Sequence, residues 1–265
     1  MCGIAGIINY NPIIKDQLAS IVGSMIRTIG HRGPDGNGIW KNEKGNICFG
    51  HARLSIIDLS DEGNQPMVSH SQNFIITFNG EIYNYIEIRK ELKNSGALFK
   101  GTSDTEVLLA AIEKWGIKKA IKKANGMFAF AVLDIKNCKI WFGRDRAGKK
   151  PLYIYNDLNQ YVFSSEIKGI LSVPNINLTI SHQAMSNYLS LGFVIGSGTI
   201  YNEIKEVSPG ALIEFDYMNQ SMNEIKYWEF PKQTPLVLSK TEIQSKTENY
   251  LKDSIKLRMR ADVPV

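Results

Sequence analysis

Met1-Cys2-Gly3-Ile4-Ala5-Gly6-Ile7-Ile8-Asn9 opens the chain and places a thiol beside the first amino group. The apolar, β-branched residues after Cys2 predict a buried strand over residues 3–9 that holds the terminus rigidly. If Met1 is removed, Cys2 carries a free α-amine, which can act as the base for the thiol of the same residue. Their ordinary pKa values, roughly 7.7–8.0 and about 8.5, are close enough for easy proton transfer. From these first residues alone, a Cys after the initiator Met can also be incidental.

The composition excludes several classes of protein. At 265 residues and 43% hydrophobic content, the chain can form one large domain with an appendage and is not disordered. There is no run of about 18 apolar residues and no secretory signal, so we expect a cytoplasmic protein without a membrane partner. The net charge of +5 comes from small lysine clusters. Such clusters are typical of a solvated helix face, so we expect no nucleic-acid partner.

The cysteines and histidines give no sign of a metal site. The cysteines, at positions 2, 48 and 138, are too few and too scattered for a disulfide framework. No CxxC or Cys/His pairing occurs, so we expect no zinc or other metal. Cys48 and Cys138 lie in apolar, strand-like stretches and are expected to be core thiols. His31 and His51 are isolated near a loop and a strand, so we assign them structural roles and not that of a base.

Hydrophobic periodicity predicts helices and a largely antiparallel set of strands. The helices are expected over residues 14–29, 84–95, 105–115 and 240–259. The strands are expected over residues 3–9, 47–57, 73–79, 127–135, 139–142, 152–155, 161–164, 211–216 and 225–230. Gly and Pro make residues 30–38 and 192–198 loops. Asn84 with Glu87, and Ser103 with Glu106, have the spacing of N-terminal capping pairs, and Gly116 predicts a helix end.

Several further motifs follow the N-terminal strand in a fixed order. They are His31-Arg32-Gly33-Pro34-Asp35, Arg53-Leu54-Ser55-Ile56-Ile57-Asp58-Leu59, Gly63-Asn64-Gln65-Pro66-Met67, Phe78-Asn79-Gly80-Glu81-Ile82-Tyr83-Asn84, Ser103-Asp104-Thr105-Glu106, and Gly143-Arg144-Asp145 through Pro151-Leu152-Tyr153. With the N-terminal stretch, this series resembles the glutaminase half of glutamine-hydrolysing asparagine synthetases, which are class II glutamine amidotransferases and N-terminal-nucleophile hydrolases. Residues 199–201, 209–210 and 258–265 extend the similarity over nearly the whole chain. The shared order favours Cys2 as a nucleophile over an incidental residue.

The resemblance implies a fold and a reaction. The fold is an α+β, four-layer αββα sandwich of two mostly antiparallel sheets, the N-terminal-nucleophile hydrolase fold. The predicted helices and strands agree with it. The reaction is hydrolysis of the side-chain amide of glutamine to glutamate and ammonia through a thioester at Cys2, with the ammonia passed to a second site.

The attack of a thiolate on an amide creates an oxyanion, and each hydrogen-bond donor aimed at it stabilises the transition state by roughly 3–4 kcal/mol. By resemblance, these donors are the Asn79 side chain and the backbone N–H of Gly80. Asn supplies an amide N–H, and Gly has no Cβ to obstruct the substrate. From the residues alone, Asn79-Gly80 also fits a simple turn.

Glutamine also carries an α-carboxylate and an α-ammonium group, so its site needs a cation and an anion. By resemblance, Arg53 grips the carboxylate in a bidentate fork, and Asp104 and Glu81 face the ammonium. The same resemblance places Leu54 and Ile56 in the pocket. From the residues alone, Arg53 also suits a strand edge and Asp104 also suits the first turn of a helix.

The resemblance divides the chain into residues 1–230, a glutaminase domain, and residues 231–265, a linker and the first helix of a truncated synthetase domain of the ATP-pyrophosphatase type. In the family, the motif that resembles Ala261-Asp262-Val263-Pro264-Val265 is followed directly by an ATP-binding loop. We therefore expect no cofactor in this chain, with ATP and Mg bound only by the missing domain. Aspartate or another acceptor acid would act through that domain. The apolar face of helix 240–259 would support self-association, such as a homodimer.

Three functions remain open at this point. The first is a glutaminase feeding ammonia to asparagine synthesis, or to a relative that amidates another carboxylate such as a sugar acid. The second is a non-catalytic glutamine-binding module, if Met1 is retained and its peptide bond blocks the Cys2 amine. The third is an N-terminal-nucleophile amidase acting on acylated substrates, which would not require Arg53 and Asp104.

Overall fold

The strands form two antiparallel sheets in the computed structural model, which describes residues 1–10, 17–232 and 237–264. Each sheet has six strands among these residues. The first has the order β10 (Ile204–Glu206), β8 (Tyr153–Asn156), β9 (Gln160–Ser164), β1 (Gly3–Asn9), β3 (Ile47–Arg53) and β2 (Gly36–Lys41). The second has the order β12 (Ser221–Lys226), β11 (Ala211–Asp216), β7 (Lys139–Arg144), β6 (Gly126–Asp134), β5 (Phe74–Ile82) and β4 (Met67–Val68).

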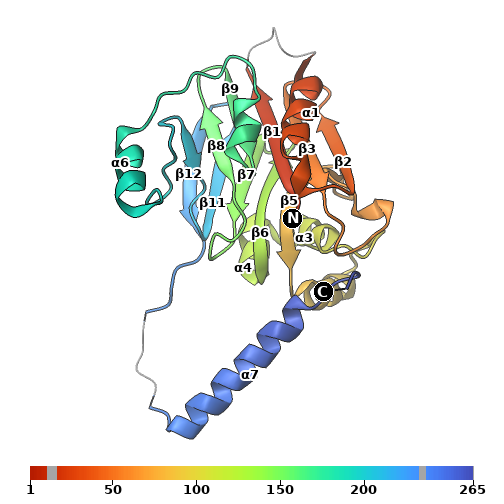
Figure 1. The fold of residues 1–265 in the computed structure, drawn as a ribbon. Coiled ribbons are helices and arrows are strands. Elements are labelled where there is room, and N and C mark those ends of the chain that lie inside the picture. The colour runs from red at the N-terminus through yellow and green to blue at the C-terminus, as the bar shows by residue number, and fades with distance from the viewer. Residues whose placement is uncertain (11–16, 233–236, 265) are drawn as a thin grey trace.

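The helices cover the outer faces of both sheets (Figure 1). Helices α1 (Leu18–Thr28) and α5 (Ile167–Leu171) pack on the first sheet. Helices α2 (Tyr85–Asn94), α3 (Asp104–Trp115) and α4 (Ile117–Lys123) pack on the second sheet. A separate cluster of buried apolar residues from β1, β3, β5, β6 and β7 fills the space between the sheets. The expected four-layer αββα sandwich is therefore confirmed.

The alternation of side chains along three strands decides what lies between the sheets. On β1, Ile4 and Ile8 face the inner core, whereas Ala5 and Ile7 face the helix layer. Cys2 shares the inward parity of Ile4. By the same counting, residues 49, 51 and 53 of β3 and residues 75, 77 and 79 of β5 face inward. Cys2, His51, Arg53 and Asn79 thus gather at one end of the inner core.

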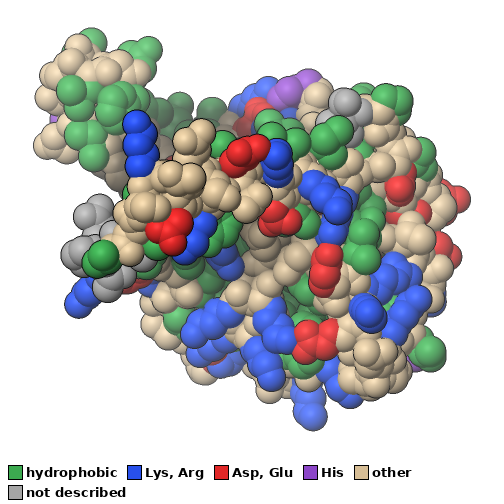
Figure 2. Space-filling model, turned by 90° about the horizontal axis from the view of Figure 1, so that it is seen from below, with side chains coloured by type: hydrophobic (Ala, Val, Ile, Leu, Met, Phe, Trp, Pro, Cys, Tyr) green, Lys and Arg blue, Asp and Glu red, His purple; other side chains and the backbone are tan. Residues whose placement is uncertain are grey.

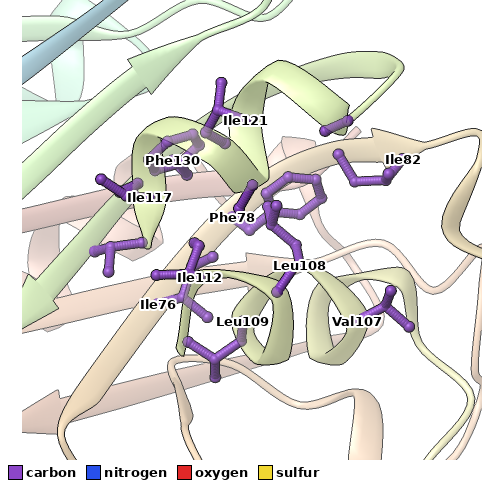
Figure 3. Packing of buried hydrophobic residues seen from close by; sticks show 14 of the residues in the cluster. Ile76, Phe78, Ile82, Val107, Leu108, Leu109, Ile112, Ile117, Ile121 and Phe130 are labelled. Carbon is purple, nitrogen blue, oxygen red and sulfur yellow. The ribbon is translucent and has the colours of Figure 1, made fainter. Parts of the chain in front are cut away.

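The core under the second sheet holds β5 in place (Figure 3). Leu108 and Ile112 of α3 pack against Ile76 and Phe78 of β5, and all four are 1% exposed or less. Burial of each such side chain contributes about 1.5–3 kcal/mol. β5 is therefore a rigid base for the polar residues that follow Phe78.

Most predicted elements are confirmed, with shifted ends. The predicted helix 14–29 appears as α1, and its residues 14–16 lie outside the described part of the chain. The strand predicted over 225–230 occupies 221–226. The loop predicted over 30–38 contains a short 3₁₀ helix, η2 (Gly30–Arg32), and the start of β2. A second 3₁₀ helix, η3 (Asp61–Gly63), and helix α6 (His182–Leu191) were not predicted. η3 is too short to show a period, whereas Ala184, Tyr188 and Leu191 of α6 do lie at helical spacing.

Two local predictions are wrong, each for a geometric reason. Asn84 begins α2 without capping it, because its side chain instead bonds Lys123 O at 3.0 Å and the N–H of Asn125 at 2.8 Å. Cys138 is not a core thiol, since it lies partly exposed at φ 55° in the turn between β6 and β7. Cys48 is buried in β3 as expected, and Ser103 caps α3 through the N–H of Glu106.

Helix α7 (Lys240–Arg258) extends away from the sandwich and then brings the chain back to it (Figure 1). None of its described residues is buried, but Arg258 in its last turn stacks on Tyr83, with the guanidinium carbon 4.7 Å from the ring centroid. The residues that follow it also have partners. Arg260 forms an ion pair with Glu87 of α2.

Candidate functional site

A cavity of about 230 Å³ opens at the end of the inner core. Most of its walls come from the start of β1, from the end of β3 and the irregular segment after it, from the end of β5, and from the first turn of α3. Met127 of β6 and Lys150 complete the lining. Every residue assigned to the site by resemblance lines this cavity: Cys2, Arg53, Leu54, Ile56, Asn79, Gly80, Glu81 and Asp104. The fold therefore brings together residues that are up to 102 positions apart, from 2 to 104, in the sequence.

The Cys2 thiol contacts the backbone of Leu54. The N–H of Leu54 donates to Cys2 Sγ at 3.3 Å, and Sγ lies 3.5 Å from Leu54 O. Burial raises the pKa of the thiol, and the Leu54 N–H opposes this by favouring the thiolate. The Cys2 carbonyl accepts a hydrogen bond from Arg32 Nε at 2.9 Å, which fixes the backbone at the nucleophile. With Met1 present the terminal amine belongs to Met1, and burial lowers its pKa.

Asn79 is the most unusual polar residue of the cavity. Its side chain is 1% exposed, and among the described residues neither Oδ1 nor Nδ2 has a hydrogen-bond partner. A buried amide without partners costs roughly 1–3 kcal/mol, so the fold holds Asn79 here at the expense of stability. Asn79 also lies inside β5, three residues before its end, which rules out the turn interpretation of Asn79-Gly80.

The N–H of Gly80 points into the same cavity. Alternate N–H groups of β5 point away from β6: that of Phe78 donates to Gln65 Oε1 and that of Ile82 donates to Asp104 Oδ2, both at 2.7 Å. Gly80 lies midway between them, so its N–H has the same direction. The N–H and C=O of Phe128, opposite Gly80, are both engaged with Asp145 on the far side of β6.

The neighbouring strand requires glycine at position 80. The sequence had suggested instead that the missing Cβ admits the substrate. A Cβ at this position would lie 2.2 Å from Met127 O and 2.7 Å from Phe128 Cα. The missing side chain makes room for the neighbouring strand and not for a substrate. The backbone N–H is what Gly80 presents to the cavity.

Asp104 and Glu81 supply negative charge on one wall. Asp104 is 5% exposed at the start of α3, where burial, together with the nearby charge of Glu81, raises the pKa of its carboxyl to about 7. The hydrogen bond from Ile82 opposes these effects. Burial also raises the pKa of Glu81. A cation in the cavity would favour the ionised form of both carboxyls.

Arg53 lines the cavity, but its guanidinium also organises the adjacent loop. Nη1 donates to Ser60 O at 2.9 Å and to Asn64 Oδ1 at 2.7 Å, and Nη2 donates to Asp58 O. Arg53 is thus more than a strand-edge residue, since it holds residues 58–64 against the end of β3.

Lys150 is a cavity residue that sequence reasoning missed. It is 5% exposed, and within the described ranges its ammonium has no hydrogen bond or ion pair. Burial lowers the pKa of Lys150, and the neighbouring Glu81 and Cys2 oppose the shift. Asp145 places it there by accepting the N–H groups of Lys149 and Lys150, each at 3.0 Å. The signal was available in the Gly143-to-Tyr153 motif, within which Lys150 lies next to Pro151.

His51 reaches the cavity from between the sheets. Its Nε2 donates to Phe78 O at 3.1 Å and must therefore carry a proton, because a carbonyl can only accept. Burial lowers the pKa of His51 to about 4, so the ring stays neutral near pH 7. The bond ties β3 to β5, in line with the structural role assigned to His51. His31 lies outside the cavity, 2.9 Å from Glu166 Oε1.

The family model named "Glutamine amidotransferase domain" matches residues 1–228. The chain belongs to this family. A curated relative, the putative asparagine synthetase [glutamine-hydrolyzing] 2 of Methanocaldococcus jannaschii, is 38% identical and is matched over 100% of this chain and 53% of its own length. Asparagine synthetase [glutamine-hydrolyzing] 1 of Bacillus subtilis is 35% identical, over 100% of this chain and 41% of its own. The chain thus spans about half the length of these relatives.

The fold of the amidotransferase domain recurs in solved structures. Glutamine phosphoribosylpyrophosphate amidotransferase from B. subtilis, solved with ADP and GMP, superposes with a TM-score of 0.63. The match covers 86% of this chain and 49% of that one at 21% sequence identity. At this sequence identity the similarity supports the shared fold alone, and the chemistry must be argued from the residues of the site.

Over residues 1–10, 17–232 and 237–264, no helix has both the length and the apolar character needed to cross a membrane. In the same part of the chain, no three or more His, Cys, Asp or Glu side chains form a group that could hold a metal ion.

Proposed function

We propose that this domain hydrolyses glutamine to glutamate and ammonia, with Cys2 as nucleophile once Met1 has been removed. The observation that carries the proposal is the buried, unpartnered amide of Asn79 in the same cavity as the Cys2 thiol. A donor without a partner in the free protein is available for an oxyanion that exists only during the reaction.

The reaction follows from the positions of these groups. The Cys2 α-amine takes the thiol proton, and Sγ attacks the side-chain carbonyl carbon of glutamine. Asn79 Nδ2 and the Gly80 N–H donate to the oxyanion. The C–N bond then breaks, the amine passes its proton to the leaving nitrogen, and ammonia departs. A water molecule next attacks the thioester, giving up one proton to the amine, which returns it to the Cys2 sulfur as glutamate leaves.

The charged side chains on the cavity walls are complementary to the α-ammonium and α-carboxylate groups of glutamine. We assign the α-ammonium of glutamine to Asp104 and Glu81, which lie near each other. Neither forms an ion pair among the described residues, although Lys150 is close enough to act on the charge of Glu81. We assign the α-carboxylate to Arg53, with Leu54 and Ile56 along the same wall. Arg53 already holds backbone carbonyls, so the carboxylate would share the guanidinium with the loop over residues 58–64.

We further propose that the ammonia serves ATP-dependent synthesis of asparagine from aspartate. The names of the two relatives support this acceptor, and another carboxylate such as a sugar acid is the alternative. The reaction would need ATP- and Mg-binding residues other than those described. We retain the division at residues 230 and 231, which the end of the family match at residue 228 supports, and a cytoplasmic location. Exposed apolar residues of α7, such as Leu251 and Ile255, support self-association as a homodimer, which sedimentation of the chain would test.

Amino-terminal sequencing combined with an ammonia-release assay tests the glutaminase. We expect material that begins at Cys2 to form glutamate and ammonia in equal amounts, and Cys2→Ser to form neither. Met1-retaining protein should bind glutamine without turnover, which is the second open function. If Cys2-initiated protein releases no ammonia, the proposal fails.

Arg53→Ala separates glutamine from acylated substrates. On our proposal it raises KM for glutamine by about 10-fold or more, because a buried charge partner of the carboxylate is lost. An unchanged KM would favour the third function, an amidase that does not read the α-carboxylate.

A further inference from the structure

The chain after α7 returns to the wall of the glutamine cavity. Asp262 contacts this wall in both directions: its backbone N–H donates to Ile56 O at 2.8 Å, and its carboxylate accepts the N–H of Asp58 at 2.7 Å. Arg260 supports the contact by donating to Glu87 at 2.6 and 2.7 Å and to Tyr83 O at 2.5 Å. In Figure 1 the chain that follows α7 accordingly returns to the sandwich near the lower end of β5.

The wall held in this way has little regular structure of its own. Residues 54–60 belong to no helix or strand, yet Leu54, Ser55, Ile56 and Ile57 line the cavity. Asp58 adopts φ 59°, a left-handed conformation that a residue with a Cβ keeps only when its surroundings enforce it.

The surroundings of Asp58 hold every polar group of that residue. Arg53 Nη2 donates to its carbonyl. Its carboxylate accepts the N–H groups of Ser60 at 3.1 Å and Thr102 at 2.6 Å. Asp262 completes the set at the backbone N–H. Removal of the Asp262 carboxylate would leave the Asp58 N–H without this partner, whereas the bond from the Asp262 backbone N–H to Ile56 O does not depend on the side chain.

We propose that Asp262 is a positioning residue for glutamine binding. It acts through Ile56 and Asp58, by holding the cavity wall in the conformation that receives the substrate. This inference rests on the proposed glutaminase function. Because coupling between two sites is reciprocal, glutamine in the cavity also favours the docked position of residues 260–262. The segment that follows α7 therefore reports the occupancy of the cavity.

The test compares Asp262→Ala, Asp262→Asn and Glu248→Ala in the Met-free chain. Asp262→Ala should raise KM for glutamine about 10-fold and leave kcat within about 2-fold, because a hydrogen bond to a charged group is lost from the binding wall only. Asp262→Asn keeps an oxygen acceptor for the Asp58 N–H and should restore most of the affinity. Glu248→Ala removes a carboxylate from the exposed face of α7, where it pairs only with Lys252 among the described residues, and should match the parent protein.

Hydrogen exchange keeps this test separate from the glutaminase assay. A peptide containing residues 55–60 should exchange faster in Asp262→Ala than in the parent, whether or not the parent releases ammonia. In the parent, glutamine should slow exchange in a peptide containing residues 258–264. Unchanged exchange, or faster exchange with an unchanged KM, overturns the inference, whereas an inactive parent with the expected exchange overturns only the proposed glutaminase.

Discussion

The carboxylate of Asp104 accepts the backbone N–H of Ile82 at 2.7 Å and thereby joins the first turn of α3 to the last residue of β5. This bond holds the acid at the cavity. Burial nevertheless raises the pKa of Asp104 to about 7, so near neutrality a large share of the molecules carry a neutral carboxyl.

The first prediction concerns this proton. The ammonium of glutamine favours the carboxylate and lowers the pKa of Asp104, so binding at about pH 6.5 should release up to one proton. Affinity for glutamine should accordingly rise with pH up to about 7 and level off above it. Calorimetry in buffers of different ionisation enthalpy measures the release directly. Asp104→Asn should bind glutamine weakly and release fewer protons than the parent, since only Glu81 then titrates against the ammonium. A parent protein with no dependence on the buffer would remove Asp104 from the site.

The second prediction concerns Asn79. Asn79→Leu should lower kcat by about 10²–10³-fold with little change in KM, because the side chain is assigned to the oxyanion and not to the bound substrate. The same change removes a buried amide without partners, so the free energy of unfolding should stay level or rise, by up to about 1–3 kcal/mol. Urea denaturation and steady-state kinetics give both values. A variant that is less stable and fully active would contradict the assignment.

The third prediction concerns Gly80. Gly80→Ala should reduce the free energy of unfolding by about 1–3 kcal/mol or more, since the new methyl group collides with the backbone of β6. Gly30→Ala is the matched control, because a Cβ there meets no atom within 4 Å. Equal stability of the two variants in urea would show that β5 and β6 can separate at this point.

The fourth prediction concerns Lys150. Its cation lies close enough to Cys2 to favour the thiolate, so Lys150→Met should raise the pKa of the Cys2 thiol. Alkylation of Cys2 by iodoacetamide should therefore slow at fixed pH, and its pH profile should move to higher pH. Lys150→Arg keeps the charge and should preserve the profile. A profile unchanged in Lys150→Met would mean that the ammonium does not act on the sulfur.

Much of the fold could be predicted, because strands buried on both faces read as short, continuous runs of apolar and β-branched residues. Alternation along residues 3–9 and 73–79 already specifies which side chains share a face. β2 was missed because its residues alternate only between half-buried and exposed, so its sequence lacks a fully apolar face. Cys138 was misplaced because its apolar neighbours Ile135 and Ile140 flank a tight turn, and a left-handed residue in such a turn leaves no periodic trace.

The candidate site, like the fold, could be predicted only in part. Cys2, Asn79 and Asp104 could be proposed from motifs, and the structure places them in one cavity. Lys150 was missed because a single lysine in a polar loop resembles any solvated lysine until the fold buries it. Asp262 was missed because its partners are distant in the sequence: Asp58 lies 204 positions before it, and Ile56 is close to Asp58. No local sequence pattern encodes such a contact.

The location of β1 has a consequence for how the protein matures. β1 lies between β9 and β3, its residues are buried from Gly3 onward, and Met1 is 57% exposed directly before it. An aminopeptidase binds extended backbone on both sides of the bond that it cleaves. In the folded protein, the residues that follow this bond in β1 are already paired with β9 on one edge and with β3 on the other. We expect the initiator to be cleaved while the nascent chain is still open, so that folded Met1 protein resists the peptidase and unfolded protein is trimmed, as mass spectrometry would show. The fraction of molecules with a free Cys2 amine would then be set during synthesis, before the sheet has formed.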